Sequence, residues 1–138
     1  MADQLLKMKL MKMQRKIYLA SDHRGVDLKS NLINSLKVLD LPFEDLGPNG
    51  DQSVDYPDFA HLLSKKMKKN NRQLGILVCG SGIGMSITAN KHKNVRAALC
   101  YNVKSARLSR EHNNANVIAI GARLTKKNVA LKCVSTFI

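Results

Sequence analysis

The sequence predicts a doubly wound, Rossmann-like α/β domain, in which helices cover both faces of a five-stranded parallel sheet. Short apolar runs alternate with longer stretches whose apolar residues recur at helical spacing. These strand–helix units follow one another in strict alternation, which is typical of a parallel sheet with right-handed crossovers. The length of 138 residues suits a single domain, for which we expect residues 16–138.

The first part of the chain contains two predicted strands and two predicted helices. Lys16 to Ser21 has the composition of a strand, and a helix with a regular apolar face follows it, at Val26, Leu28, Leu32, Ile33, Leu36 and Leu39. Phe43 to Leu46 is a second, weaker strand, followed by the turn-rich loop GPNGDQSVDYP. Pro57 suits the first turn of the next helix, whose apolar positions are Phe59, Leu62, Leu63 and Met67.

The second part of the chain continues the alternation. We expect strands at Leu74 to Cys79, Arg96 to Cys100 and Val117 to Ile120. Helices are expected at Met85 to His92 and Val103 to His112. A last helix has its apolar face at Ala130, Cys133, Val134 and Phe137.

Composition excludes several classes of protein. The apolar runs are far shorter than the roughly 20 residues that a membrane-spanning helix needs, and the first residues lack the apolar centre of a secretory signal. We therefore expect a cytoplasmic protein with no membrane partner. Residues 1–15 are interpreted as a flexible extension that carries no chemistry. The chain has three cysteines, Cys79, Cys100 and Cys133. Their odd number and the lack of CxxC spacing argue against a disulfide framework or a zinc site.

The net charge of +13 raises the question of nucleic-acid binding, since clustered Lys and Arg release counterions from a phosphate backbone. The lysines are scattered, however, with modest groups at 65–69 and 126–127, and the chain has only three Tyr and three Phe to stack on bases. We interpret these groups as solvated helix faces and expect no nucleic-acid partner. A positive surface also raises the encounter rate with small phosphorylated metabolites.

Reactive groups follow two of the predicted strands, in SDHRG (21–25) and CGSGIG (79–84). Ligands of open parallel sheets bind beyond the carboxyl ends of the strands, where the strand order reverses. The glycines of the second loop allow its N–H groups to turn inward, so the loop suits an anionic oxygen. A thiolate at Cys79 could then remove a proton from carbon while the N–H groups stabilise the charge on the neighbouring oxygen.

Purely structural roles are also compatible with these residues. Gly-rich turns are common at strand–helix junctions, and GSGIG is neither a Walker loop nor a complete GxGxxG. Cys79 could be a small buried apolar residue. Asp22 could cap the first helix, and His23 could be a loop histidine with a local partner. Cys100 and Cys133 are expected in the core.

Four segments in order, SDHRG, DYPDFA, GILVCGSGIGMSITANK and SREHNNANVIAIGAR, resemble the ribose-5-phosphate isomerase type B family, which includes the galactose-6-phosphate isomerase subunits. The similarity extends from about Lys16 to Phe137. The resemblance implies an aldose–ketose isomerase that uses neither metal nor cofactor. It also implies a Rossmann-like fold assembled as a homodimer or a dimer of dimers.

The resemblance further implies a role for each matching residue. Cys79 would be the base that moves a proton between C1 and C2 of the sugar, since Met85 stands where some relatives have a glutamate base. His112 would assist opening of the furanose ring. The N–H groups around the cis-enediolate would come from Gly80, Ser81, Gly82, Ile83 and Gly84, with the Ser81 hydroxyl beside them.

Substrate binding is assigned in the same way. Asp22, His23 and Asn113 would bind sugar hydroxyls or phosphate, and Arg123 would pair with the phosphate. Family members usually continue beyond the last helix into a segment rich in His and Arg, whereas the sequence given ends at Ile138. If the protein ends there, we expect phosphate binding to rest on Arg123, His23 and nearby lysines; the alternative is that the sequence given is truncated.

Topology separates Cys79 from His112 within one chain. The helix that ends at His112 must return to the start of the fifth strand, and a strand of about five residues spans roughly 16 Å, beyond the reach of an imidazole. The two residues can share a site only if His112 and Asn113 come from a second subunit across a two-fold interface. The alternative is a histidine that ends a helix and meets its last carbonyl groups.

Interconversion of ribose 5-phosphate and ribulose 5-phosphate, in the pentose phosphate pathway, is the leading functional hypothesis. The motifs leave the length of the sugar open, so a phosphorylated hexose such as galactose 6-phosphate or allose 6-phosphate is the alternative substrate. The depth of the pocket near Tyr56 and Asp22 would discriminate the two. A noncatalytic sugar-phosphate-binding protein is a third hypothesis, against which the presence of Cys79 and His112 argues.

Overall fold

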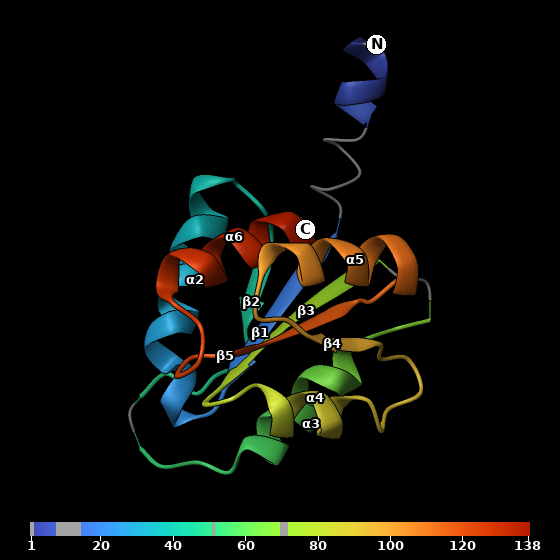
Figure 1. Cartoon of the computed structure of the whole chain (residues 1–138). Helices are drawn as coiled ribbons and strands as arrows, with labels where there is room; N and C mark the ends of the chain where they lie inside the picture. The colour runs from blue at the N-terminus through green and yellow to red at the C-terminus, as the bar shows by residue number, and fades with distance from the viewer. Residues whose placement is uncertain (1, 8–14, 51, 70–71) are drawn as a thin grey trace.

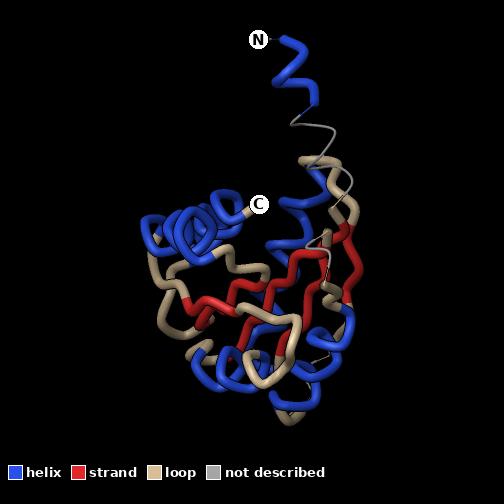
Figure 2. Tube along the Cα trace, turned by 90° about the vertical axis from the view of Figure 1, so that its right-hand side faces the viewer, coloured by secondary structure: helices blue, strands red, loops and turns tan. Residues whose placement is uncertain are grey.

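The computed structural model describes residues 2–7, 15–50, 52–69 and 72–138. In this part of the chain a five-stranded parallel sheet has the order β2-β1-β3-β5-β4. The strands lie in the middle of the molecule (Figure 2). They are β1 (Lys16–Ser21), β2 (Phe43–Asp45), β3 (Gln73–Cys79), β4 (Ala97–Leu99) and β5 (Val117–Gly121). This arrangement confirms the predicted fold class.

Helices cover both faces of the sheet (Figure 1). One face carries α2 (Val26–Val38), α5 (Val103–Asn113) and α6 (Lys127–Phe137). The other carries α3 (Tyr56–Lys66) and α4 (Ile83–Ala89). The central strand β3 is buried on both faces because it lies between these two layers, which explains its continuous apolar run.

Each layer has its own apolar core. The first cluster joins side chains of α2, β5 and α6, among them Leu32, Leu36, Ile118, Cys133 and Phe137. The second joins β3, α3 and α4, among them Leu63, Leu77 and Met85. Cys100 and Cys133 are buried, as predicted.

Several details differ from the prediction. Leu39 and Leu62 are 55% and 41% exposed, so they are not core positions, and β2 ends at Asp45, one residue before the predicted end. Helix α4 begins at Ile83 and ends at Ala89, before the predicted end at His92. The side chain of Asn90 then accepts a hydrogen bond from the N–H of Ala97 (2.7 Å) and donates to its carbonyl group (2.9 Å). These bonds turn the chain toward β4, which is shorter than predicted.

The described residues before β1 add no strand to the sheet. Residues 2–7 are helical, with Leu5 and Leu6 exposed. The extension predicted at residues 1–15 includes residues 1 and 8–14, which lie outside the described residues, so its flexibility stays a prediction. Among the helices that the structure describes, none combines the length and apolar character needed to cross a membrane.

Candidate active site

A cleft of about 340 Å³ lies at the carboxyl edge of the sheet, where β1 and β3 are neighbours. The chain leaves β1 toward β2 on one side and returns past β1 to form β3, so the strand order reverses at this point. Helix α2 then runs over one face and α4 over the other (Figure 1). Such a reversal opens a crevice for a ligand. The residues of the cleft that concern the chemistry are Asp22, Arg24, Tyr56, Cys79, Ser81 and Arg123.

Cys79 ends β3 at the floor of this cleft and is 4% exposed. Its sulfur accepts a hydrogen bond from the backbone N–H of Gly82 at 3.1 Å. Gly82 has φ +80°, and a Cβ there would lie 2.7 Å from a methyl carbon of Leu99. Only glycine fits this turn, which directs an N–H group back onto the sulfur. The sulfur therefore has a fixed backbone donor beside it.

Ser81 is fixed by contacts on its backbone and side chain. Its hydroxyl oxygen accepts from the N–H of Ile83 (3.1 Å), which leaves the hydroxyl hydrogen for another acceptor. Its carbonyl group accepts from the hydroxyl of Tyr101 (3.3 Å). The same carbonyl packs against Gly121, where a Cβ would collide with it. The Ser81 hydroxyl was predicted to belong to this site, whereas the contacts of Ser81 with Ile83, Tyr101 and Gly121 were not predicted.

The loop after β5 brings Arg123 to the mouth of the cleft. The N–H of Ala122 donates to the carbonyl group of Cys79 (2.8 Å), and the N–H of Arg123 donates to that of Gly80 (2.9 Å). A Cβ on Gly80 would lie 3.2 Å from Cδ of Arg24 and 3.7 Å from Cδ of Arg123. The two arginine stems therefore flank Gly80 and give the mouth a positive charge.

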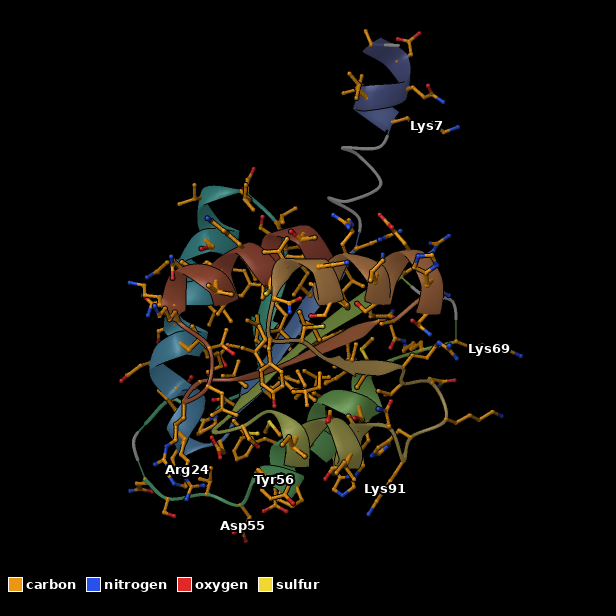
Figure 3. All side chains as sticks on the ribbon, in the orientation of Figure 1. Lys7, Arg24, Asp55, Tyr56, Lys69 and Lys91 are labelled. Atoms are coloured by element: carbon orange, nitrogen blue, oxygen red, sulfur yellow. The ribbon has the colours of Figure 1, made fainter. Side chains whose placement is uncertain are left out.

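Arg24 is a cleft residue that the sequence analysis did not assign. The sequence feature that could have identified Arg24 is its position in SDHRG, at the carboxyl end of the first strand. Its guanidinium lies 3.7 Å from the carboxylate of Asp22. Figure 3 shows Arg24 and Tyr56 in the lower part of the view, away from Lys69 at its right edge.

Asp22 combines a structural contact with a place in the cleft. It is 2% exposed, and its carboxylate accepts from the N–H groups of Arg24 (2.9 Å) and Gly25 (3.1 Å). The capping role considered from sequence is therefore present, on the short 3₁₀ turn His23–Gly25. The contact also holds Asp22 at the cleft wall.

His23 and Tyr56 reach the site differently. His23 is half-buried, and its Nδ1 lies 3.2 Å from the N–H nitrogen of Val54 and 3.3 Å from its carbonyl oxygen. It does not itself line the cleft, although its sequence neighbours Asp22 and Arg24 do. Where Nδ1 accepts from Val54, a neutral ring carries its proton on Nε2. Tyr56 begins α3 and lines the cleft, where a Cβ on Gly84 would lie 2.6 Å from its ring. The missing side chain of Gly84 thus leaves room for Tyr56.

His112 and Asn113 lie far from Cys79 in the chain described. They are the exposed last residues of α5, which runs back along the sheet (Figure 1). The carbonyl group of Asn113 accepts from Nε of Arg96 (2.8 Å), and Arg96 directly precedes β4. The two residues therefore lie at the amino edge, as topology predicted. Their participation in a shared site stays a prediction.

Metal-ligating side chains do not gather in the residues that the structure describes: no group of three or more His, Cys, Asp or Glu is placed to hold an ion. The three cysteines are free and buried. The donors available in the cleft include N–H groups, the hydroxyls of Ser81 and Tyr56, and the guanidinium groups of Arg24 and Arg123, which suit an anionic ligand rich in oxygen.

Comparisons with known proteins show the family to which the sequence is similar. The sequence model of the ribose/galactose isomerase family matches residues 17–138. A probable ribose-5-phosphate isomerase B of Mycoplasma pneumoniae is 43% identical over 129 residues, which are 93% of this chain and 85% of the relative.

Solved structures give the same result. Ribose-5-phosphate isomerase B of Mycoplasma genitalium with bound ribulose 5-phosphate superposes with a TM-score of 0.87 at 44% identity, covering 91% of this chain and 84% of that one. Ribose-5-phosphate isomerase B of Clostridium thermocellum gives a TM-score of 0.85 at 43% identity, with 88% and 82% covered.

Proposed function

The chain belongs to the ribose/galactose isomerase family and is a sugar-phosphate isomerase, and from this premise we propose that it interconverts ribose 5-phosphate and ribulose 5-phosphate with Cys79 as the base. The observation that carries the proposal is the sulfur of Cys79 at the floor of the cleft, 3.1 Å from the N–H of Gly82. The ribulose 5-phosphate bound to the similar Mycoplasma genitalium enzyme supports the choice of sugar.

The proposed reaction moves one proton between neighbouring carbons of the open-chain sugar. The thiolate of Cys79 removes the proton from C2 of the aldose, and the electron pair forms the C1–C2 double bond while charge develops on O1. The hydroxyl proton at C2 passes to O1, and the thiol returns its proton to C1. A general base of this kind contributes about 10² to 10⁴ in rate.

The cis-enediolate needs donors at its oxygens. In this proposal the N–H groups of the loop 80–84 and the Ser81 hydroxyl supply them, and the N–H of Gly82 already lies 3.1 Å from the sulfur. Preorganised donors cost no rearrangement as charge develops, which is why such groups stabilise an intermediate so strongly. Gly82 exchanges its contact with sulfur for one with the substrate oxygen in this scheme.

The phosphate is held at the mouth of the cleft by Arg123, joined by Arg24. A guanidinium binds phosphate with two parallel N–H bonds, and two arginines that flank one glycine can engage different oxygens. Asp22 and Tyr56, which also line the cleft, bind sugar hydroxyls. His23 contributes through Nε2, while Nδ1 remains with Val54.

The active form is a homodimer with two shared sites, in which His112 and Asn113 of one chain complete the cleft of the other. Ile83 and Ile87 lie on one side of α4 and are 45% and 59% exposed, and Tyr101 beside them is 40% exposed. An apolar surface next to the cleft is suited to a second copy of the chain. His112 then assists ring opening, because an imidazole can move a proton to or from the ring oxygen.

An assay of the purified enzyme on five- and six-carbon sugar phosphates tests the proposal. We expect the largest kcat/KM for ribose 5-phosphate and ribulose 5-phosphate, with activity unchanged after treatment with a chelator. A larger kcat/KM for galactose 6-phosphate or allose 6-phosphate would transfer the assignment to the hexose substrate. Binding of sugar phosphates without turnover would contradict an isomerase.

A further inference from the structure

Lys29 is a buried lysine that no part of the reaction above uses. It lies in the second turn of α2 and is 1% exposed. Its Nζ donates to Oδ1 of Asp45 at 2.6 Å and to the carbonyl oxygen of Pro48 at 2.6 Å. Asp45 is the last residue of β2, and Pro48 lies in the loop that follows it. A lysine is rarely buried to this extent unless its ammonium group has defined partners.

We propose that Lys29 is a positioning residue, which fixes the segment 45–48 and thereby the wall of the cleft formed by Asp22 and Tyr56. The kinetic test of this role rests on the proposed isomerase activity, whereas the structural test, by hydrogen exchange, rests on the geometry alone. Lys29 itself lines no part of the cleft.

The contacts of the segment lead from Lys29 to the cleft. Oδ1 of Asp45 also accepts from the N–H of Gly47 at 2.9 Å, so one carboxylate oxygen joins α2 to the turn. The carbonyl group of Gly47 accepts from the N–H of Ser21 at 3.1 Å. Ser21 immediately precedes Asp22. The backbone that supports Asp22 is therefore bonded to the turn that Lys29 holds.

The same turn also contacts α3. Gly47 has φ +101°, and a Cβ there would lie 3.3 Å from the ring of Phe59. Phe59 is one turn into α3, the helix that begins with Tyr56. A shift of Gly47 would therefore move the start of α3 as well as the end of β1. These are the elements that carry Tyr56 and Asp22.

Stability alone is a weak reason for this arrangement. Replacing a buried ion pair by apolar side chains of similar volume is often neutral or stabilising, because desolvation offsets the attraction between the charges. The ammonium group adds directional hydrogen bonds, which hold the carboxylate of Asp45 and the carbonyl group of Pro48 in one position relative to α2. A methionine would fill the same space without fixing the turn.

Lys29→Met is the test variant, and Lys16→Met is its matched control. Lys16 also joins β1 to β2 through an ion pair, with Nζ 3.1 Å from Glu44, but both side chains are about half exposed and lie away from the cleft. The measurements are the KM and kcat for ribose 5-phosphate, together with hydrogen exchange of the amide groups of Ser21 and Gly47.

We expect Lys29→Met to raise KM by about tenfold, with a smaller change in kcat, and to speed exchange at Ser21 and Gly47. Lys16→Met leaves both measurements near their original values. A purely structural role predicts a different result, since a loss of folded protein lowers kcat at constant KM. An unchanged KM with unchanged exchange would overturn the proposal.

A second variant keeps the test informative if Lys29→Met does not fold. Asp45→Asn retains an oxygen for Lys29 and Gly47 but removes the charge, so a smaller change in the same direction is expected in KM and in exchange. No change in either measurement with Asp45→Asn would also overturn the proposal. If the unmodified enzyme turned over no sugar phosphate, the exchange measurements would still decide the role of Lys29.

Discussion

The backbone N–H of Gly82 lies 3.1 Å from the sulfur of Cys79, at the point where β3 ends and α4 is about to begin. This contact relates the two halves of the proposed chemistry. In that proposal the sulfur is the base that takes a proton from carbon, and the N–H is one of the donors that meet the charge produced by that step.

Cys79→Ser is expected to lower kcat by about 10² to 10⁴ while the fold and much of the sugar-phosphate affinity remain. A serine hydroxyl occupies nearly the same space but is too weak an acid to supply the base. Steady-state kinetics and ligand titration measure the two effects. The matched control is Cys133→Ala, a buried cysteine on α6, whose folded fraction should keep its turnover. Near-normal turnover in Cys79→Ser would remove Cys79 from the role of base.

Gly82→Ala is expected to cost roughly 1–3 kcal/mol of folding stability and to reduce kcat strongly. The left-handed φ strains an alanine, and its Cβ would meet Leu99 and the backbone of Ile120. Urea unfolding and kinetics measure the change. Gly50→Ala is the control, since a Cβ there meets nothing within 4 Å. Equal effects of the two substitutions would show that the turn does not require a glycine at position 82.

Arg123→Ala is expected to raise KM for phosphorylated sugars by about tenfold or more, with less effect on kcat. The side chain lies at the mouth of the cleft, where its loss removes a charged partner of the phosphate. Arg107→Ala, an exposed arginine on α5 paired with Glu111, serves as control. If KM for ribose 5-phosphate stayed constant in Arg123→Ala, the phosphate would have to bind elsewhere.

Mixing Cys79→Ser and His112→Ala proteins is expected to restore part of the activity that each has lost. A mixed dimer contains one site that has both substitutions and one that has neither, provided that each cleft takes His112 from the other chain. The measurement is the activity after the two inactive proteins have been unfolded and refolded together. Refolding each variant alone gives the baseline. Failure of the mixture to exceed it, with dimer exchange demonstrated, would contradict the shared site.

The stability of the protein is expected to fall as the pH drops below about 6.5, partly through a histidine pair between α3 and the turn after α4. Nδ1 of His61 lies 2.7 Å from Nε2 of His92, and burial, followed by the charges of His61 and Lys65, lowers the pKa of His92 below its ordinary 6.5. The unfolded chain therefore binds a proton that the folded chain resists, so stability is complete above the unfolded pKa and declines between that value and the lower folded one.

Thermal unfolding measured between pH 5 and pH 8 tests this expectation. His92→Gln should flatten the decline on the acid side, because it removes the group whose protonation the fold opposes. His112→Gln is a control at an exposed position. A pH profile of His92→Gln that follows the original protein would show that other groups cause the decline.

The sequence by itself determined the layers of the fold and the identity of the reactive loop. Alternating apolar runs and helical spacing are local properties, so β1, β3 and β5 could be predicted to within a residue at each end. The loop CGSGIG can also be recognised from the local sequence, because its glycines follow an apolar strand and precede a helix. Cys79, Ser81 and Asp22 were predicted as site residues and line one cleft.

Tertiary structure alone decided which residues complete that cleft. Arg24 faces it because the turn capped by Asp22 directs its stem toward Gly80, and the same cap turns His23 toward Val54. The role inferred for Lys29 depends on Asp45 and Pro48, which are 16 and 19 positions away in the chain and meet it only when β2 pairs with β1. Periodicity reports which face of an element is buried, whereas the partners of a polar group depend on how the elements pack, and no local pattern contains that information.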